Sequence, residues 1–164
     1  MTHLWTPWRS AYMQQKKEKS RCIFCDALAS SDDEENLVVY RGKSTFVMLN
    51  LYPYTSGHLM IAPHAHVSRL AQISEETANE MMKLTRRAEE IIEAVYQSDG
   101  LNLGMNLGRA AGAGIEEHIH MHVLPRWLGD ANFMTSVSNT RVIPESLQET
   151  YAKLKTGFSL GSKL

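Results

Sequence analysis

Hydrophobic and polar positions alternate in short runs over the first half of the chain. Apolar, β-prone segments at residues 36–41 (NLVVYR) and 45–50 (TFVMLN) flank Gly42-Lys43-Ser44, a pattern typical of a hairpin. A third segment, residues 58–63 (HLMIAP), follows a turn that contains proline and glycine. The pattern therefore predicts three consecutive strands that can pair with one another.

The hydrophobic period then changes from two residues to three or four. Ser74 offers a capping hydroxyl ahead of Glu75 and Glu76, so a helix is expected to begin there and to continue to about Gln97. Its apolar positions form one stripe: Met81, Leu84, Ala88, Ile91 and Val95. A last helix is expected to open at Pro144-Glu145, with apolar positions at Leu147, Tyr151, Leu154 and Phe158.

Two further strands are predicted between the helices. Residues 101–107 (LNLGMNL) and 118–124 (HIHMHVL) are separated by the small-residue loop 108–114 (GRAAGAG). Together the elements predict an α+β fold, with an antiparallel sheet of about five strands, a long helix and a C-terminal helix. At 164 residues the chain is expected to form one domain.

Composition argues against several classes of function. The net charge of −1, with 43% hydrophobic and 21% charged residues, indicates no nucleic-acid partner and no membrane surface. No run approaches the roughly 18 apolar residues of a membrane span, and the first 20 residues lack the apolar core of a signal peptide. We therefore expect a cytoplasmic protein, whose two cysteines stay reduced and serve as ligands or redox groups.

Three of the seven histidines, His118, His120 and His122, stand at alternate positions. On a strand they would share one face, roughly 6 to 7 Å apart, while Ile119 and Met121 point the other way. Such a face can bind one metal ion, commonly zinc. Alternatively, one histidine can attack phosphorus while its neighbours hold the phosphate. A core that merely tolerates histidines is the third interpretation.

The segment before the histidines favours phosphate chemistry. Successive backbone N–H groups in the loop 108–114 can bind an anion, and Asn106 can donate its side-chain amide to a phosphate oxygen. A zinc enzyme would need an acidic base, and Glu116 and Glu117 directly precede the histidines. A metalloenzyme that uses all three histidines therefore stays open as an alternative.

These segments together resemble the histidine triad (HIT) family of nucleotide hydrolases and transferases. HIHMHVL matches the family signature, and MLNLYPYTSGHLMIAPHAH resembles the family's earlier segment. LWTPWR and PRWLGDANFM resemble the subgroup related to diadenosine tetraphosphate phosphorylases. The resemblance implies one domain over residues 1–164, with an N-terminal arm (about 1–20) and a C-terminal extension (about 125–164). It also implies cleavage of dinucleoside polyphosphates through a covalent nucleotidyl-histidine intermediate, by phosphorolysis or hydrolysis.

The resemblance further implies roles for single residues. His120 would be the nucleophile, and His118 would support the arrangement. The implied phosphate-binding residues are Asn106, Ala113, Gly114 and His122. The implied nucleoside-binding residues are Asn50 at the ribose, with Met48 and Phe24 as apolar walls for the base; for Met48, simple core packing is left open as an alternative. His58 stands at a recurrent family histidine, and a structural role for it is left open beside a functional one.

The pair Cys22-x-x-Cys25 has three interpretations when taken alone: half of a zinc site, a redox motif or two buried thiols. The resemblance implies a structural zinc site of the Cys2His2 type, made by Cys22, Cys25, His66 and His118. A divalent cation would be brought in with the substrate. Family members often dimerise, so a homodimer is expected.

The chain departs from two branches of the family at Gly114 and Ile115. Those branches carry a glutamine and a hydroxyl residue at the two positions, and the hydroxyl could help to protonate the leaving group. Its absence fits the phosphorylase-like subgroup and leaves the second acceptor open between phosphate and water. A broad-specificity AMP-releasing nucleotide hydrolase and a non-catalytic nucleotide-binding sensor remain alternatives.

Overall fold

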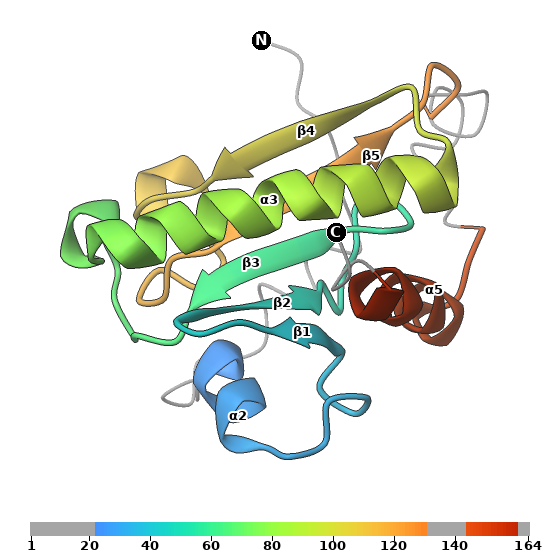
Figure 1. Ribbon diagram of the computed structural model, residues 1–164. Helices are drawn as coiled ribbons and strands as arrows, with labels where there is room; N and C mark the ends of the chain where they lie inside the picture. The colour runs from blue at the N-terminus through green and yellow to red at the C-terminus, as the bar shows by residue number, and fades with distance from the viewer. Residues whose placement is uncertain (1–21, 131–143, 161–164) are drawn as a thin grey trace, which may run out of the picture.

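The computed structural model describes residues 22–130 and 144–160. These residues form an α+β fold, which confirms the predicted fold class (Figure 1). Five antiparallel strands make one sheet in the order β1-β2-β3-β5-β4. The strands are β1 (Val38–Arg41), β2 (Thr45–Leu49), β3 (Leu59–Pro63), β4 (Gly100–Met105) and β5 (Met121–Arg126).

Helices cover both faces of this sheet. The long helix α3 lies across one face, with α5 beside it, and the short helix α2 lies near β1 (Figure 1). Their bounds are Ile23–Ala29 for α2, Glu75–Tyr96 for α3 and Leu147–Leu160 for α5. Two 3-10 turns, η1 (Leu70–Gln72) and η2 (Arg109–Ala111), lie in the connections.

The predicted start of α3 is confirmed in detail. The Ser74 hydroxyl accepts a hydrogen bond from the backbone N–H of Thr77 at 3.2 Å, and two glutamates occupy the first turn. The helix ends at Tyr96 and is capped by Gln97, which adopts a left-handed conformation with φ of 47°. Its buried stripe packs on the sheet and on α5, because Met81, Leu84, Ala88, Ile91 and Ile92 face the core.

The hairpin between β1 and β2 is fixed by one carboxylate of α3. Glu80 accepts hydrogen bonds from the backbone N–H groups of Lys43 and Ser44, both at 2.7 Å, and from the Ser44 hydroxyl. These hydrogen bonds hold the pKa of Glu80 below its usual value, although burial acts in the opposite direction. The turn is therefore held to α3 by a charged group.

The two faces of the sheet carry separate cores. Val47, Leu59 and Val123 pack against α3 and α5, whereas Met48, Met60 and Phe24 pack on the opposite face. Cross-strand partners share a face. Met48 pairs with Met60, and Met60 pairs with His122, so the last triad histidine lies on the face covered by α2.

Several predicted boundaries are shorter in the structure. β5 begins at Met121, so His118 and His120 precede the ladder, where the Ile119 N–H donates to the carbonyl of Val67 instead. β4 ends at Met105 and α5 begins at Leu147, three residues after Pro144. The N-terminal arm and part of the C-terminal extension lie outside the described residues. Within the described ranges, no helix is long and apolar enough to span a membrane.

Candidate active site and metal centre

The three triad histidines lie at the start of β5, in order of increasing exposure. His118 is fully buried, His120 is 6% exposed, and His122 is half-buried. The ring centroids of His120 and His122 are 4.7 Å apart. Phe24, on α2, packs against the rings of His118 and His120. The centroid of its ring lies 4.8 Å from that of His120 and 4.9 Å from that of His118. The three imidazoles therefore form one continuous group.

The hydrogen bond of His120 defines its tautomer. Its Nδ1 lies 2.9 Å from the carbonyl oxygen of His118. Because a carbonyl only accepts, Nδ1 carries the proton, and Nε2 keeps a free lone pair. Burial lowers the pKa of His120, although the bond to the carbonyl acts in the opposite direction. A neutral ring with an unprotonated Nε2 is the form that can attack an electrophile.

A second hydrogen-bond chain defines the tautomer of His122. The Tyr54 N–H donates to Nδ1 of His58 at 3.2 Å, so the His58 proton must reside on Nε2. That Nε2 lies 2.9 Å from Nδ1 of His122 and donates to it. His122 consequently carries its own proton on Nε2. The hydrogen bonds from Tyr54 to His58 and from His58 to His122 therefore leave the Nε2–H of His122 as a hydrogen-bond donor.

The imidazole rings of His58 and His122 are both neutral near pH 7. Burial, together with the neighbouring His122 and His120, lowers the pKa of His58 to about 3. Burial, together with His120, lowers the pKa of His122 to about 4. Desolvation disfavours a charged imidazole. The site therefore offers neutral donors and acceptors.

The predicted nucleoside residues lie on the same face or beside His58. The Asn50 amide nitrogen lies 3.4 Å from Nδ1 of His58, and its carbonyl oxygen accepts from the Tyr52 N–H at 2.9 Å. Met48 is 6% exposed and packs with Phe24, which has no exposed surface. Met48 and Phe24 are thus close to the triad, but Phe24 presents no open surface in this structure.

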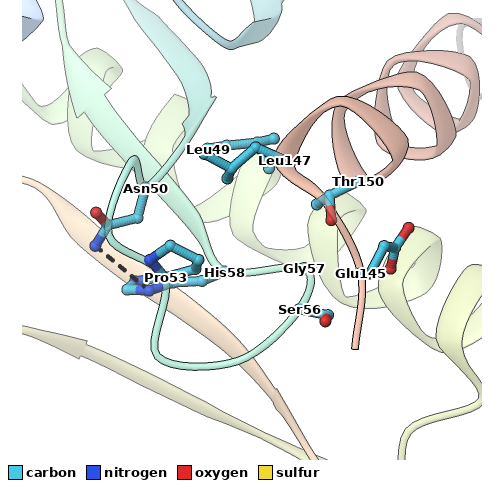
Figure 2. Close-up of a pocket in the computed structure, with 9 residues that line it drawn as sticks. All are labelled: Leu49, Asn50, Pro53, Ser56, Gly57, His58, Glu145, Leu147 and Thr150. Atoms are coloured by element: carbon cyan, nitrogen blue, oxygen red, sulfur yellow. Dashed lines mark hydrogen bonds between the residues drawn. The ribbon is translucent and has the colours of Figure 1, made fainter. Parts of the chain in front are cut away.

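A small cavity lies next to His58. It has a volume of about 10 Å³, and Figure 2 shows Asn50 and His58 beside each other with the turn residues Ser56 and Gly57 and with Glu145. Such a cavity holds about one water molecule and no nucleoside. An open hollow of about 360 Å³ lies at the turn that carries Lys43. Neither is lined by a triad histidine, so the candidate site is defined by the imidazoles rather than by an enclosed cavity.

The predicted phosphate loop follows β4. Asn106 is half-buried directly after the strand, and η2 forms the middle of the loop. Gly108 and Gly112 both have φ near +80°, a conformation that side chains disfavour. Ala113 is half-buried and Gly114 exposed. The loop residues that were predicted to contact phosphate therefore stand in an open, irregular segment.

The four predicted metal ligands converge. Their ligand atoms all lie within 4.8 Å of one another: Cys22, Cys25, His66 and His118. The distance from Sγ to Nδ1 is 3.3 Å between Cys22 and His118 and 3.3 Å between Cys25 and His66. A tetrahedral zinc site separates sulfur and nitrogen ligands by about 3.6 Å. The donor set therefore fits zinc.

The orientation of both imidazoles also fits a metal. Nε2 of His118 donates to the carbonyl of Pro63 at 2.9 Å, which leaves Nδ1 unprotonated toward the thiols. Nε2 of His66 lies 4.0 Å from a carboxylate oxygen of Glu117. Burial, together with the neighbouring Cys22, raises the pKa of the Cys25 thiol to about 11. Because zinc binds thiolates, its binding would displace protons.

Two features of the site were not predicted. The contact between His58 and His122 joins residues 64 positions apart, and no spacing in the sequence indicates it. The role of Tyr54 depends on its backbone N–H, which every residue except proline possesses. Only the recurrence of His58 in the resembled family pointed toward this position.

Comparisons with known proteins agree with this geometry. The HIT domain model matches residues 31–127. The chain is 40% identical over 163 residues to the AP-4-A phosphorylase of Mycobacterium tuberculosis (strain H37Rv), covering 95% of this chain and 84% of that protein. It is 30% identical over 93 residues to the asymmetrical bis(5'-nucleosyl)-tetraphosphatase of Schizosaccharomyces pombe, covering 57% of this chain and 50% of that protein.

A solved structure shows the same fold. It is a Zn-bound histidine triad family protein from Mycobacterium smegmatis, with a TM-score of 0.70 and 26% sequence identity. The match covers 87% of this chain and 96% of that one.

Proposed function

Because the chain belongs to the histidine triad (HIT) family, we propose that it is an enzyme that cleaves dinucleoside polyphosphates such as diadenosine tetraphosphate. The reaction would proceed through a covalent nucleotidyl intermediate on His120. The observation that carries this proposal is the tautomer of His120, whose Nδ1 donates to a carbonyl and whose Nε2 lone pair is free. The name of the 40% identical relative supports the substrate class.

In the first step, Nε2 of His120 attacks the α-phosphorus. A nitrogen–phosphorus bond forms, and the bond from phosphorus to the bridging oxygen breaks, so that ATP leaves from diadenosine tetraphosphate. The Nε2–H of His122 would donate to a phosphoryl oxygen, since its Nδ1 is occupied by His58. The Asn106 amide and the backbone N–H groups of Ala113 and Gly114 would stabilise the remaining negative charge.

In the second step, an acceptor takes the nucleotidyl group from His120. Inorganic phosphate as acceptor yields ADP, and water yields AMP; in both cases the phosphorus–nitrogen bond breaks and His120 is regenerated. We propose phosphorolysis as the principal reaction. The AP-4-A phosphorylase relative is similar over nearly the whole chain, and Gly114-Ile115 lacks a hydroxyl. Hydrolysis is the second candidate, which the tetraphosphatase relative favours.

The nucleoside would bind on the face that carries Met48. Asn50, which contacts His58 near the triad, would bind the ribose. Met48 would bound the base, and Phe24, whose ring is fully buried beneath the imidazoles, would support this wall without touching the base. Purine preference would then depend on apolar contact rather than on hydrogen bonds.

Zinc would be held by Cys22, Cys25, His66 and His118, and would supply a structural cross-link between α2 and the segments that follow β3 and precede β5. With His118 engaged through Nδ1, that ring serves as a support for His120 and takes no part in the chemistry. A divalent cation bound to the polyphosphate would enter with the substrate.

The deciding experiment is incubation of the protein with diadenosine tetraphosphate with and without inorganic phosphate. ADP plus ATP, formed only when phosphate is present, marks a phosphorylase; AMP plus ATP in its absence marks a hydrolase. His120→Asn serves as the control for the nucleophile. Tight nucleotide binding by the wild type without any product would instead identify a sensor and overturn the proposal.

A homodimer is proposed on the exposed side of β4. This strand is one of the two edges of the sheet, and Leu103 on it is 50% exposed. Met82 on α3 is 53% exposed. Apolar side chains at an unpaired edge favour contact with a second copy. Light scattering should give a dimer for the wild type and a monomer for Leu103→Asp; a monomeric wild type at micromolar concentration would contradict this assembly.

A further inference from the structure

Phe24 lies between the two cysteines of the metal centre and beneath the nucleophile. It follows Cys22 by two positions and precedes Cys25 by one. Its ring has no exposed surface and contacts the rings of both His118 and His120. The side chain therefore touches a metal ligand and the proposed nucleophile at the same time.

The helix that carries Phe24 is short and depends on contacts at both ends. α2 has seven residues, and a helix of this length is not stable alone. At its C-terminal end, the Arg41 guanidinium donates to the carbonyls of Ala27, Leu28 and Ser30 at 2.8, 3.2 and 2.9 Å. At its N-terminal end, the two thiols face His66 and His118. A metal bound there would fix the N-terminal end.

The ring of His120 needs support from packing. One hydrogen bond, from Nδ1 to the carbonyl of His118, fixes the tautomer but still permits the ring to tilt about that bond. Phe24 lies against one part of the ring and His122 against another. Removal of the Phe24 ring would leave space into which the imidazole can turn, and Nε2 would lose its direction.

We propose that Phe24 is a positioning residue that couples the metal centre to the nucleophile. The metal holds Cys22 and Cys25, these hold Phe24, and Phe24 holds the ring of His120 with Nε2 directed toward substrate. The inference rests on the proposed role of His120. It differs from a wall for the base, because a residue that only contacts the base would affect substrate binding and not the reactivity of His120.

A base-free probe separates these two roles. Potassium phosphoramidate transfers its phosphoryl group to an imidazole nitrogen and releases ammonia. The rate of phosphorylation at His120 therefore measures the reactivity of that ring in the absence of any nucleoside. The zinc-loaded wild type, Phe24→Leu and the neighbouring control Ile23→Ala would be compared, because Ile23 is 44% exposed on the same helix. Phosphorylation is mapped by alkaline peptide analysis, and zinc by metal analysis.

We expect F24L to keep its zinc and to phosphorylate His120 about tenfold more slowly, since misdirected reacting groups lose rate steeply. With diadenosine tetraphosphate its kcat should fall by a similar factor while KM changes little. I23A should match the wild type. Chelation of zinc from the wild type should slow labelling as F24L does, and chelation of F24L should add little further loss, because both changes act on one chain of contacts.

Labelling of His120 at the wild-type rate in zinc-loaded F24L would overturn the proposal, as would fully additive effects of F24L and chelation. If F24L is unfolded by circular dichroism, Phe24→Met, which keeps most of the buried volume, replaces it under the same criteria. Failure of the proposed function would give a different result: the wild type would still be labelled by phosphoramidate at His120 but would not cleave the nucleotide.

Discussion

His58 is the residue whose role changes most once the hydrogen bonds are known. It is fully buried, accepts from a backbone N–H and donates to His122. It therefore fixes which nitrogen of His122 carries the proton, and so which one would donate to a phosphate. A group two contacts removed from the substrate can control catalysis in this way, since the donor must be present before charge develops.

Substitution of His58 tests this chain of donors. His58→Asn cannot place a donor at the Nε2 position, whereas His58→Gln can, because its amide nitrogen extends to about the same distance. We expect H58N to lower kcat about tenfold or more, with a smaller change in KM, and H58Q to recover part of that loss. Steady-state kinetics on diadenosine tetraphosphate provides the measurement. Equal activity of H58N and wild type would show that His122 needs no donor behind it.

The types of the site residues could be predicted, but not their hydrogen bonds. Alternation in HIHMHVL placed three histidines together, and the resemblance distinguished His120 from its neighbours. The hydrogen-bond partner of His118 and of His120 is a backbone carbonyl in each case, and the partner of His122 is the imidazole of His58. Backbone carbonyls are present at every residue, so no sequence pattern marks the ones that accept.

Among the elements, α2 shows the limit of periodicity most clearly. Residues 22–30 contain two cysteines and only seven helical positions, too few for an apolar stripe. The helix is stabilised by tertiary contacts, chiefly burial of Phe24 and the hydrogen bonds from Arg41. In contrast, α3 has a cap, acids in its first turn and a stripe over 22 residues, so its bounds were predicted closely.

The metal centre should matter most for α2. Cys22→Ser leaves three strong ligands, so we expect zinc to fall well below one ion per chain. The thermal midpoint should fall, because a cross-link between α2 and the segment before β5 is lost. Metal analysis and calorimetry, with and without chelator, provide the readings. If C22S retains full zinc and the wild-type midpoint, the four ligands do not form the site.

The contact between α3 and α5 permits a second element-scale prediction. A Cβ added to Gly157 would lie 2.5 Å from Cγ2 of Ile91, whereas one added to Gly100 meets no atom within 4 Å. Gly157→Ala should therefore destabilise the protein by about 1–3 kcal/mol despite the better helix propensity of alanine. Gly100→Ala is the control, and urea unfolding is the measurement. A stabilised G157A would mean that α5 can move away from α3 at little cost.

At the scale of the whole molecule, the buried neutral histidines link stability to pH. The pKa of His58 is about 3 in the folded protein and near 6.5 in an unfolded chain. Between these values the unfolded state binds more protons, so stability falls as the pH decreases from about 6.5 toward 3. The loss at pH 5 is about 2 kcal/mol for His58 alone.

Urea unfolding at pH 7.5 and pH 5 tests this linkage. The wild type should lose about 2 kcal/mol more than H58Q between the two values, since glutamine does not titrate. Equal losses in both proteins would show that His58 is already solvated or charged in the folded state.

The proposed covalent intermediate on His120 links the fold and the tautomers to the proposed reaction. Its most direct test is an alkaline quench of the protein with diadenosine tetraphosphate in the absence of phosphate, followed by mass analysis of the peptide that contains His120. One adenylyl group on His120 is the predicted result, and phosphate added before the quench should release this group as ADP. An adenylyl group on another residue, or undiminished turnover in His120→Ala, would contradict it.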